Sequence, residues 1–274
     1  MQLNFKKSGT GPPLVILHGL FGSLDNWFSI AKELVEHYTL YLVDQRNHGD
    51  SPHSNEWNYG VMVEDLRELL DAEGLDSVFL MGHSMGGKTV MNFAVNYPER
   101  VRKLIVGDIA PRYYPIHHQV ILEGLNALDL SQLQSRKEAD DLLAPYIPEL
   151  GIRQFLLKSL GRDANGFAWK INLPVITQHI EEVGKALEEG TVFEGPTLFL
   201  GGADSSYIQE KDLSDMKRHF PNSTWVSISN AGHWLHAEQP QAVVAEMRKF
   251  FRWFFYADFE EKTRRFSSLT LSDF

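Results

Sequence analysis

The stretch GHSMGGKT, residues 82–89, matches two catalytic patterns at the same time. Residues 82–86 follow G-x-S-x-G, the strained strand-to-helix turn that presents a nucleophilic serine. Residues 82–89 also follow G-x-x-x-x-G-K-[ST], the loop that holds the phosphates of a nucleotide. Both patterns expect a strand before the stretch and a helix after it. The rest of the chain must therefore decide between a serine hydrolase and a nucleotide-binding enzyme.

The composition is that of an ordinary soluble globular protein. The chain has 274 residues, of which 43% are hydrophobic and 23% charged. Its formal net charge of −10 disfavours a general nucleic-acid binder, which needs a basic face. The absence of cysteine excludes disulfides, thiolate metal sites and a cysteine nucleophile. The sequence has no membrane-length apolar run and no apolar signal peptide, so we expect a cytoplasmic protein without membrane or nucleic-acid partners.

Short apolar runs alternate with amphipathic segments along most of the chain. This alternation predicts an α/β fold with a mostly parallel central sheet and helices on both faces. The expected strands lie at residues 13–19, 39–44, 77–82, 103–111, 196–204 and 224–229. The expected helices lie at residues 23–38, 59–75, 88–98, 209–220 and 239–255.

The alternation stops between about residues 112 and 190. Helical segments such as IRQFLLKSL (152–160) and LPVITQHIEEVGKALEEG (173–190) follow one another there without a clear strand. We therefore predict a hydrolase-type α/β core, a helical cap inserted into it and a polar C-terminal tail. The expected bounds are 1–110 and 191–256 for the core, 111–190 for the cap and 257–274 for the tail. The pattern leaves a monomer and a homodimer equally open.

A serine hydrolase needs a nucleophile, a base oriented by an acid, and donors for the oxyanion. Ser84 is the candidate nucleophile, and His233, in the loop segment SNAGHWLHAEQP, is the candidate base. Two acids stand at expected strand ends, Asp108 in VGDIAP and Asp204 in GGADSS, and both remain candidates. The backbone amides expected to form the oxyanion hole belong to Leu20, in the loop HGLFG, and to Met85.

These separated features favour the hydrolase interpretation. It explains the elbow, the HGLFG loop, the strand-end acids and the histidine loop with one mechanism. The phosphate-loop interpretation explains one octapeptide and leaves the other motifs without a role.

The motifs HGLFGSLDNW, DQRNHGDSP, GHSMGGK, DIAP, QFLLKSL and AGHWLHAEQP resemble those of the α/β-hydrolase superfamily and, within it, of the YbfF-type bacterial esterases. The resemblance covers the chain except its tail. It implies a carboxylesterase or acyl thioesterase that acts on short to medium acyl esters, with acyl-CoA as a further candidate substrate. It also implies a Ser–His–Asp triad, a helical cap and no cofactor. In those esterases the acid maps onto Asp108, whereas most of the superfamily keeps it at the position of Asp204.

Further side chains are expected around the triad. His83 and Ser205 should lie beside it, and the expected lining of the acyl pocket is Phe21, Phe155, Trp169 and Trp234. His233 and His236 lack a third ligand at a recognisable spacing, so we expect no metal. Fold and triad leave other chemistry open: C–C bond hydrolysis, a lyase step, or perhydrolysis. A non-catalytic ligand-binding protein with the same fold is a further alternative.

Overall fold

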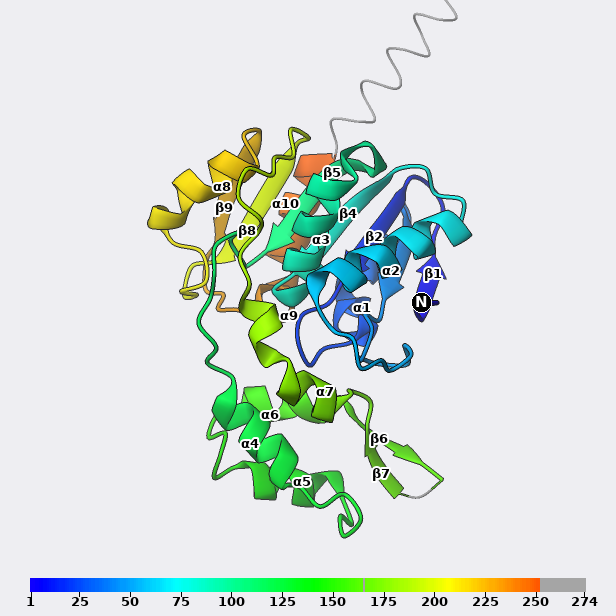
Figure 1. The fold of residues 1–274 in the computed structure, drawn as a ribbon, viewed down its shortest axis with the longest axis vertical. Coiled ribbons are helices and arrows are strands. Elements are labelled where there is room, and N and C mark those ends of the chain that lie inside the picture. Colours follow the sequence, from blue (N-terminus) through cyan, green and yellow to red (C-terminus); the bar gives the residue numbers. More distant parts are fainter. Residues whose placement is uncertain (165, 252–274) are drawn as a thin grey trace, which may run out of the picture.

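A computed structural model describes residues 1–164 and 166–251 of the chain. Within these residues, one seven-stranded sheet has the strand order β1-β3-β2-β4-β5-β8-β9 (Figure 1). Neighbouring strands are parallel except for β1, which pairs antiparallel with β3. The strands are β1 (Phe5–Ser8), β2 (Pro13–Leu17), β3 (Thr39–Val43), β4 (Val78–His83), β5 (Val101–Gly107), β8 (Thr197–Gly202) and β9 (Ser223–Ile228). The predicted mostly parallel sheet is confirmed, and β1 is an addition at its edge.

The central strands are apolar throughout because both faces of the sheet are covered. In β2, Leu14 and Ile16 belong to one apolar cluster, and Val15 and Leu17 belong to another. None of the four is more than 1% exposed. Successive side chains of a strand point to opposite faces, so a strand buried on both sides needs apolar residues at every position.

Helices form a layer on each face of the sheet (Figure 1). One layer contains α2 (Tyr59–Ala72), α3 (Met85–Asn96) and α8 (Leu213–His219). The other contains α1 (Phe28–Leu34), α9 (Leu235–Glu238) and α10 (Pro240–Phe251). Short 3₁₀ turns accompany them at η1 (Leu24–Trp27), η2 (Pro98–Arg100) and η4 (Glu210–Asp212). Helix α3 begins directly after Ser84, which places the predicted nucleophile at a strand-to-helix turn.

The segment between β5 and β8 forms a separate group of elements at one end of the molecule (Figure 1). We call residues 111–190 the cap segment, and its exact limits remain a prediction. It has its own apolar cluster, which also includes residues of the core next to Ser84, such as Leu20 and Met85. Its elements are α4 (Gln119–Ala127), α5 (Arg136–Leu143), α6 (Leu150–Leu157), β6 (Leu160–Asp163), β7 (Gly166–Trp169), α7 (Leu173–Gln178) and η3 (Ile180–Gly184).

The sequence showed no clear strand in the cap segment, but the structure has two among its helices. Strands β6 and β7 form a two-stranded antiparallel hairpin. Gly166, which begins β7 and pairs with Asp163, is a turn signal that the helical interpretation overlooked. Gly166 has a φ of +128°, which only glycine adopts without strain.

The expectation of one long helix over residues 173–190 is wrong, because the observed helix is much shorter. Helix α7 stops at Gln178, and only the short turn η3 follows. Two backbone hydrogen bonds explain the difference: the N–H of Tyr114 donates to the carbonyl of Gly184, and the N–H of Leu187 donates to the carbonyl of Pro111. The segment after α7 therefore uses its backbone groups to hold the first residues of the cap segment.

Two sequence-based expectations fall partly or wholly outside the described residues. The tail, residues 257–274, lies outside them, as do the last residues of the predicted core. Of the helices in the described part of the chain, none is long and apolar enough to cross a bilayer.

Candidate active site

The turn between β4 and α3 places the Ser84 side chain. Its backbone has φ 52° and ψ −117°, a conformation that residues with a side chain rarely adopt. A Cβ at Gly82 would lie 2.1 Å from the carbonyl oxygen of Gly86, and a Cβ at Gly86 would lie 2.5 Å from that of His18. Both positions therefore require glycine. The strained turn holds the serine at the end of the sheet where the loops meet.

Ser84, His233 and Asp108 form a hydrogen-bonded chain. His233 lies in the loop between β9 and α9, with its Nε2 3.0 Å from Oγ of Ser84. Its Nδ1 lies 2.7 Å from Oδ2 of Asp108. Because a carboxylate can only accept, Nδ1 carries the proton and donates to Asp108. Nε2 is then the acceptor that faces the serine hydroxyl.

The two candidate acids differ sharply in their surroundings. Asp108 is fully buried, and its backbone φ is 47°. Its Oδ1 accepts from the N–H of Gly202 at 3.0 Å, and its Oδ2 accepts from Oγ of Ser205 at 2.5 Å. Asp204 is exposed, and its backbone N–H donates to the carbonyl of Ala231. The geometry therefore places Asp108 on the histidine and leaves Asp204 in solvent.

The amides predicted for the oxyanion hole lie beside the serine. Leu20 and Met85 both line a small hollow together with Ser84. Within the described residues, neither of their N–H groups has a hydrogen-bond acceptor. The next amide, that of Phe21, donates instead to Nε2 of His48 at 3.3 Å. Two amides are thus free to bind an oxygen, and the third is already used by the protein.

Two buried histidines, His18 and His48, hold the HGLFG loop. Nε2 of His18 accepts from the N–H of Gln45 at 3.0 Å, so its Nδ1 donates to the carbonyl of Gly19 at 2.8 Å. His48 likewise accepts from Phe21 and donates from Nδ1 to the carbonyl of Arg46 at 3.0 Å. Burial lowers the pKa of His18 to about 4 and that of His48 to about 3. Both rings are therefore neutral at pH 7, as these bonds require.

The two side chains expected beside the triad lie there. Nε2 of His83 is 2.7 Å from the carbonyl oxygen of His233, and the two rings are 4.8 Å apart. Burial lowers the pKa of His83 to about 3, so its neutral ring donates this hydrogen bond from Nε2. Ser205 donates to the Asp108 carboxylate, as described above. One residue thus holds the backbone of the histidine, and the other holds the acid.

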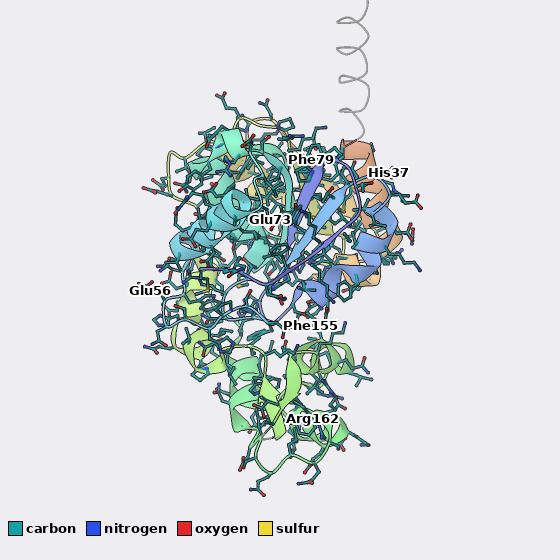
Figure 2. The ribbon with its side chains drawn as sticks, turned by 90° about the vertical axis from the view of Figure 1, so that its right-hand side faces the viewer. His37, Glu56, Glu73, Phe79, Phe155 and Arg162 are labelled. Carbon is teal, nitrogen blue, oxygen red and sulfur yellow. The ribbon has the colours of Figure 1, made fainter. Side chains whose placement is uncertain are left out.

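A cavity of about 250 Å³ opens onto Ser84 and is largely apolar. Among the described residues that line it, none is Asp, Glu, Lys or Arg. The predicted pocket residues Phe21, Phe155 and Trp234 all line it, with the rings of Phe155 and Trp234 5.5 Å apart. Figure 2 shows Phe155 where the cap segment meets the core. The rest of the lining is His18, Gly19, Leu20, Asn26, Trp27, His83, Ser84, His117, His118, Ile121, Ile152, Leu156, Tyr207, His233 and His236.

Trp169 is the one predicted pocket residue that does not line this cavity. It ends β7, where it pairs with Leu160 of β6. Its side chain packs, half-buried, against the apolar cluster of the cap segment. The hairpin that the sequence interpretation missed therefore explains why Trp169 lies away from the site.

Lys88 and Thr89, the residues that complete the phosphate-loop pattern, are engaged inside the protein. Nζ of Lys88 is buried and donates to the carbonyls of Pro111 and Arg112 at 2.8 and 2.6 Å. Oγ1 of Thr89 donates to Oε1 of Gln45 at 2.8 Å. A phosphate-binding lysine must present its ammonium group to the ligand. Here that group ties α3 to the start of the cap segment.

His236 is a packed side chain in this structure. Its ring stacks on Trp27 at 4.6 Å, and its burial holds its pKa well below the usual value. Across residues 1–164 and 166–251, no three His, Asp or Glu side chains are placed to share a metal ion.

Sequence reasoning missed three residues of the cavity, two from the cap segment and one from the loop after β8. Tyr207, His117 and His118 line the cavity, although none follows a catalytic pattern. The only signal for Tyr207 is its position three residues after Asp204, in a loop already expected to face the site. Their positions beside the cavity depend on where the chain leaves β5 for the cap segment and where it returns to the sheet at β8.

Comparisons with known proteins agree with this geometry. A sequence family described as the alpha/beta hydrolase fold matches residues 12–134. The chain is 39% identical over 249 residues to the sn-1-specific diacylglycerol lipase ABHD11 of Mus musculus, covering 88% of this chain and 81% of the mouse protein. It is 40% identical over 240 residues to esterase YbfF of Escherichia coli (strain K12), covering 87% of this chain and 92% of the other.

A solved structure shows the same relationship. The structure of a marine microorganism esterase superposes with a TM-score of 0.89 and 43% sequence identity, covering 91% of this chain and 99% of that chain. Sequence identity of about 40% over most of both chains shows that these proteins belong to one family. The chain therefore belongs to the α/β-hydrolase family, in which it is an ester hydrolase.

Proposed function

We propose that the protein hydrolyses uncharged esters of short to medium acyl chains through a covalent acyl-enzyme on Ser84. The observation that carries the proposal is the chain of contacts from Ser84 through His233 to the buried Asp108, at 3.0 and 2.7 Å. Nucleophile, base and orienting acid lie within hydrogen-bond reach of one another. The two unpartnered amides and the cavity beside the serine complete what acyl transfer needs.

In the first half-reaction, Nε2 of His233 takes the hydroxyl proton while Oγ of Ser84 attacks the ester carbonyl. The carbonyl oxygen becomes an oxyanion, which the amides of Leu20 and Met85 stabilise. Asp108 keeps Nδ1 protonated and stabilises the imidazolium that forms. When the tetrahedral intermediate collapses, the bond to the alcohol breaks. The alcohol leaves with the proton from Nε2, and the acyl group stays on Ser84.

In the second half-reaction, water takes the place of the alcohol. Nε2 of His233 removes a proton from the water, and the resulting oxygen attacks the acyl carbonyl. The same two amides hold the second oxyanion. Ser84 leaves with the proton from Nε2, and the carboxylic acid is released. The histidine returns to its neutral form, so the cycle needs no other reactant.

The cavity supports a limit on substrate size. An apolar cavity of about 150 Å³ in another protein binds benzene, which has six carbons. Scaling by volume, the 250 Å³ here holds roughly ten non-hydrogen atoms of the substrate. This size suits short and medium acyl chains.

The lining supports a limit on substrate charge. None of the lining residues in the described part of the chain is Asp, Glu, Lys or Arg, so a carboxylate on the acyl group would be buried there without a partner. Burying an unpaired charge is costly, so an uncharged acyl group is favoured. The thiol ester of a neutral acyl group satisfies the same limits, and we include it among the candidate substrates.

The test is a panel of p-nitrophenyl esters from acetate to dodecanoate, with acyl-CoA thioesters in parallel. Ser84→Ala should lower the rate by more than about 10³-fold, because removing the nucleophile of a triad removes nearly all acyl transfer. Ser206→Ala is the matched control. Ser206 is an exposed serine next to Ser205 in the chain, so this variant should keep wild-type activity. A fluorophosphonate probe should label Ser84 in the wild type, as seen by peptide mass spectrometry.

Two outcomes would overturn the proposal. Activity above a tenth of wild type in Ser84→Ala would remove the serine from the mechanism. No labelling and no turnover of any ester would favour a non-catalytic ligand-binding protein.

A matched pair tests the charge limit: p-nitrophenyl butyrate should react at least about tenfold faster than the mono-p-nitrophenyl ester of succinate.

A further inference from the structure

The ring of Tyr207 stacks directly on the ring of His233. The ring centroids are 3.9 Å apart, and the planes are inclined by only 16°. Tyr207 lies in the loop after β8, two residues beyond Ser205. The acyl-transfer steps above give Tyr207 no role. Its ring is nevertheless nearer to the His233 ring than the rings of His83 and Trp234 are, at 4.8 and 5.8 Å.

The backbone of Tyr207 is fixed from two directions. Its N–H donates to Oγ of Ser205 at 3.2 Å, and Ser205 in turn donates to Asp108. Its carbonyl accepts from the hydroxyl of Tyr114 at 2.5 Å. The loop that carries the ring is therefore tied to the triad acid on one side and to the start of the cap segment on the other.

The phenol of Tyr207 is fixed as well. Its oxygen lies 2.6 Å from Nε2 of His117 in the cap segment. The carbonyl of Pro115, 3.1 Å from Nδ1 of His117, can only accept, so Nδ1 is the donor there. Nε2 of the neutral imidazole is then the acceptor, and the Tyr207 hydroxyl donates to it. The backbone contacts hold the ring against the base, and the hydroxyl bond adds to them.

We propose that Tyr207 is the positioning residue of the base: it acts through His233 and keeps the imidazole in the plane that joins Asp108 to Ser84. The hydrogen bonds at Nδ1 and Nε2 do not by themselves oppose a swing of the ring about the axis through those two atoms. A flat ring packed on one face at 3.9 Å opposes that motion. It also offers its π face to the imidazolium that forms in each half-reaction. This inference rests on the proposed function of Ser84 and His233.

The test separates the flat ring from the hydroxyl. Tyr207→Phe keeps the ring and loses the bond to His117, so kcat should stay within about threefold of wild type. Tyr207→Leu and Tyr207→Met remove the flat ring, and kcat should fall by about ten- to a hundredfold with KM changed less than about threefold. Met adapts to irregular space, so it serves if the Leu variant does not fold.

The matched control is Tyr59→Leu. Like Tyr207, Tyr59 links core and cap, since its hydroxyl donates to the carbonyl of Val183 at 2.9 Å; unlike the half-buried Tyr207, it is buried. It has no ring contact with His233. Tyr59→Leu should lower the melting temperature while kcat of the folded protein stays near that of wild type. This control distinguishes lost positioning from loosened attachment of the cap.

Two results would overturn the inference. A wild-type kcat in a folded Tyr207→Leu or Tyr207→Met would show that the flat ring is not needed. A loss in Tyr207→Phe as large as in the aliphatic variants would move the role to the hydroxyl. Ser84→Ala keeps these results separate from the proposed function: if it is inactive while Tyr207→Met is fully active, only the inference on Tyr207 fails.

Discussion

Oδ2 of Asp108 lies 2.7 Å from Nδ1 of His233, although the two residues are 125 positions apart and their strands, β5 and β9, are not neighbours. Strand β8 lies between them and ends in two glycines. A Cβ at Gly202 would lie 2.2 Å from the carbonyl oxygen of Gly232, so the histidine loop passes directly over this strand end. The N–H of Gly202 donates to Asp108 at the same place. Because Gly202 has no side chain, the loop of His233 can cross the end of β8 and bring the histidine to Asp108.

Asp108→Asn should lower kcat by several orders of magnitude. An amide can donate to Nδ1 as well as accept from it, so the histidine is no longer held in the productive tautomer. The equivalent change in a triad protease lowers kcat by about 10⁴. Asp204→Asn is the matched control and should cost less than about tenfold, because its side chain is exposed. Steady-state kinetics on one ester decide the matter, and the reverse ranking would transfer the acid role to Asp204.

Phe155→Ala should extend the range of acyl chains that the enzyme accepts, whereas Trp169→Ala should not. Phe155 lines the cavity and its ring lies 5.5 Å from that of Trp234, so truncation enlarges the space for substrate. Trp169 packs in the β6–β7 hairpin, so truncation there should lower stability instead. The measurement is kcat/KM across p-nitrophenyl esters of rising length. If both variants shift the profile equally, the accepted acyl-chain length depends on the packing of the whole cap segment and not on Phe155 in particular.

The protein should lose stability as the pH falls from about 6.5 to about 4, partly through His18 and His48. Burial lowers the pKa of these two side chains to about 4 and about 3 in the folded protein. In the unfolded chain they protonate near 6.5. Between these values the unfolded state binds more protons, so the free energy of unfolding declines as pH falls. Each histidine contributes a slope of up to about 1.4 kcal/mol per pH unit.

Urea unfolding at pH 8, 6 and 5 of wild type, His48→Gln and His37→Gln checks this expectation. His48→Gln removes one of the buried titrating groups and should show a shallower decline with pH. His37 is exposed (Figure 2), so His37→Gln should follow the wild-type slope. Identical slopes for wild type and His48→Gln would mean that His48 does not contribute to the acid sensitivity.

The sequence alone determined the fold class and the candidate nucleophile and base. Alternating apolar strands and amphipathic helices predicted the mostly parallel sheet, because burial on both faces demands apolar residues at successive positions, as in β2. The elbow around Ser84 was recognisable because its conformation leaves no room for a side chain at Gly82 or Gly86. These features depend on local geometry, which a short stretch of sequence specifies by itself.

Tertiary structure decided what depends on the meeting of distant segments. Two aspartates at strand ends fitted the triad pattern, and the family resemblance favoured Asp108 over Asp204. The path of the histidine loop over Gly202 is what brings Asp108 to His233. Trp169 and Tyr207 are both aromatic residues near predicted loops, yet one packs in a hairpin and the other stacks on the base. Residue type and spacing record which contacts a side chain can make. Which contacts it does make follows from the order of strands in the sheet and the way the cap segment returns to it.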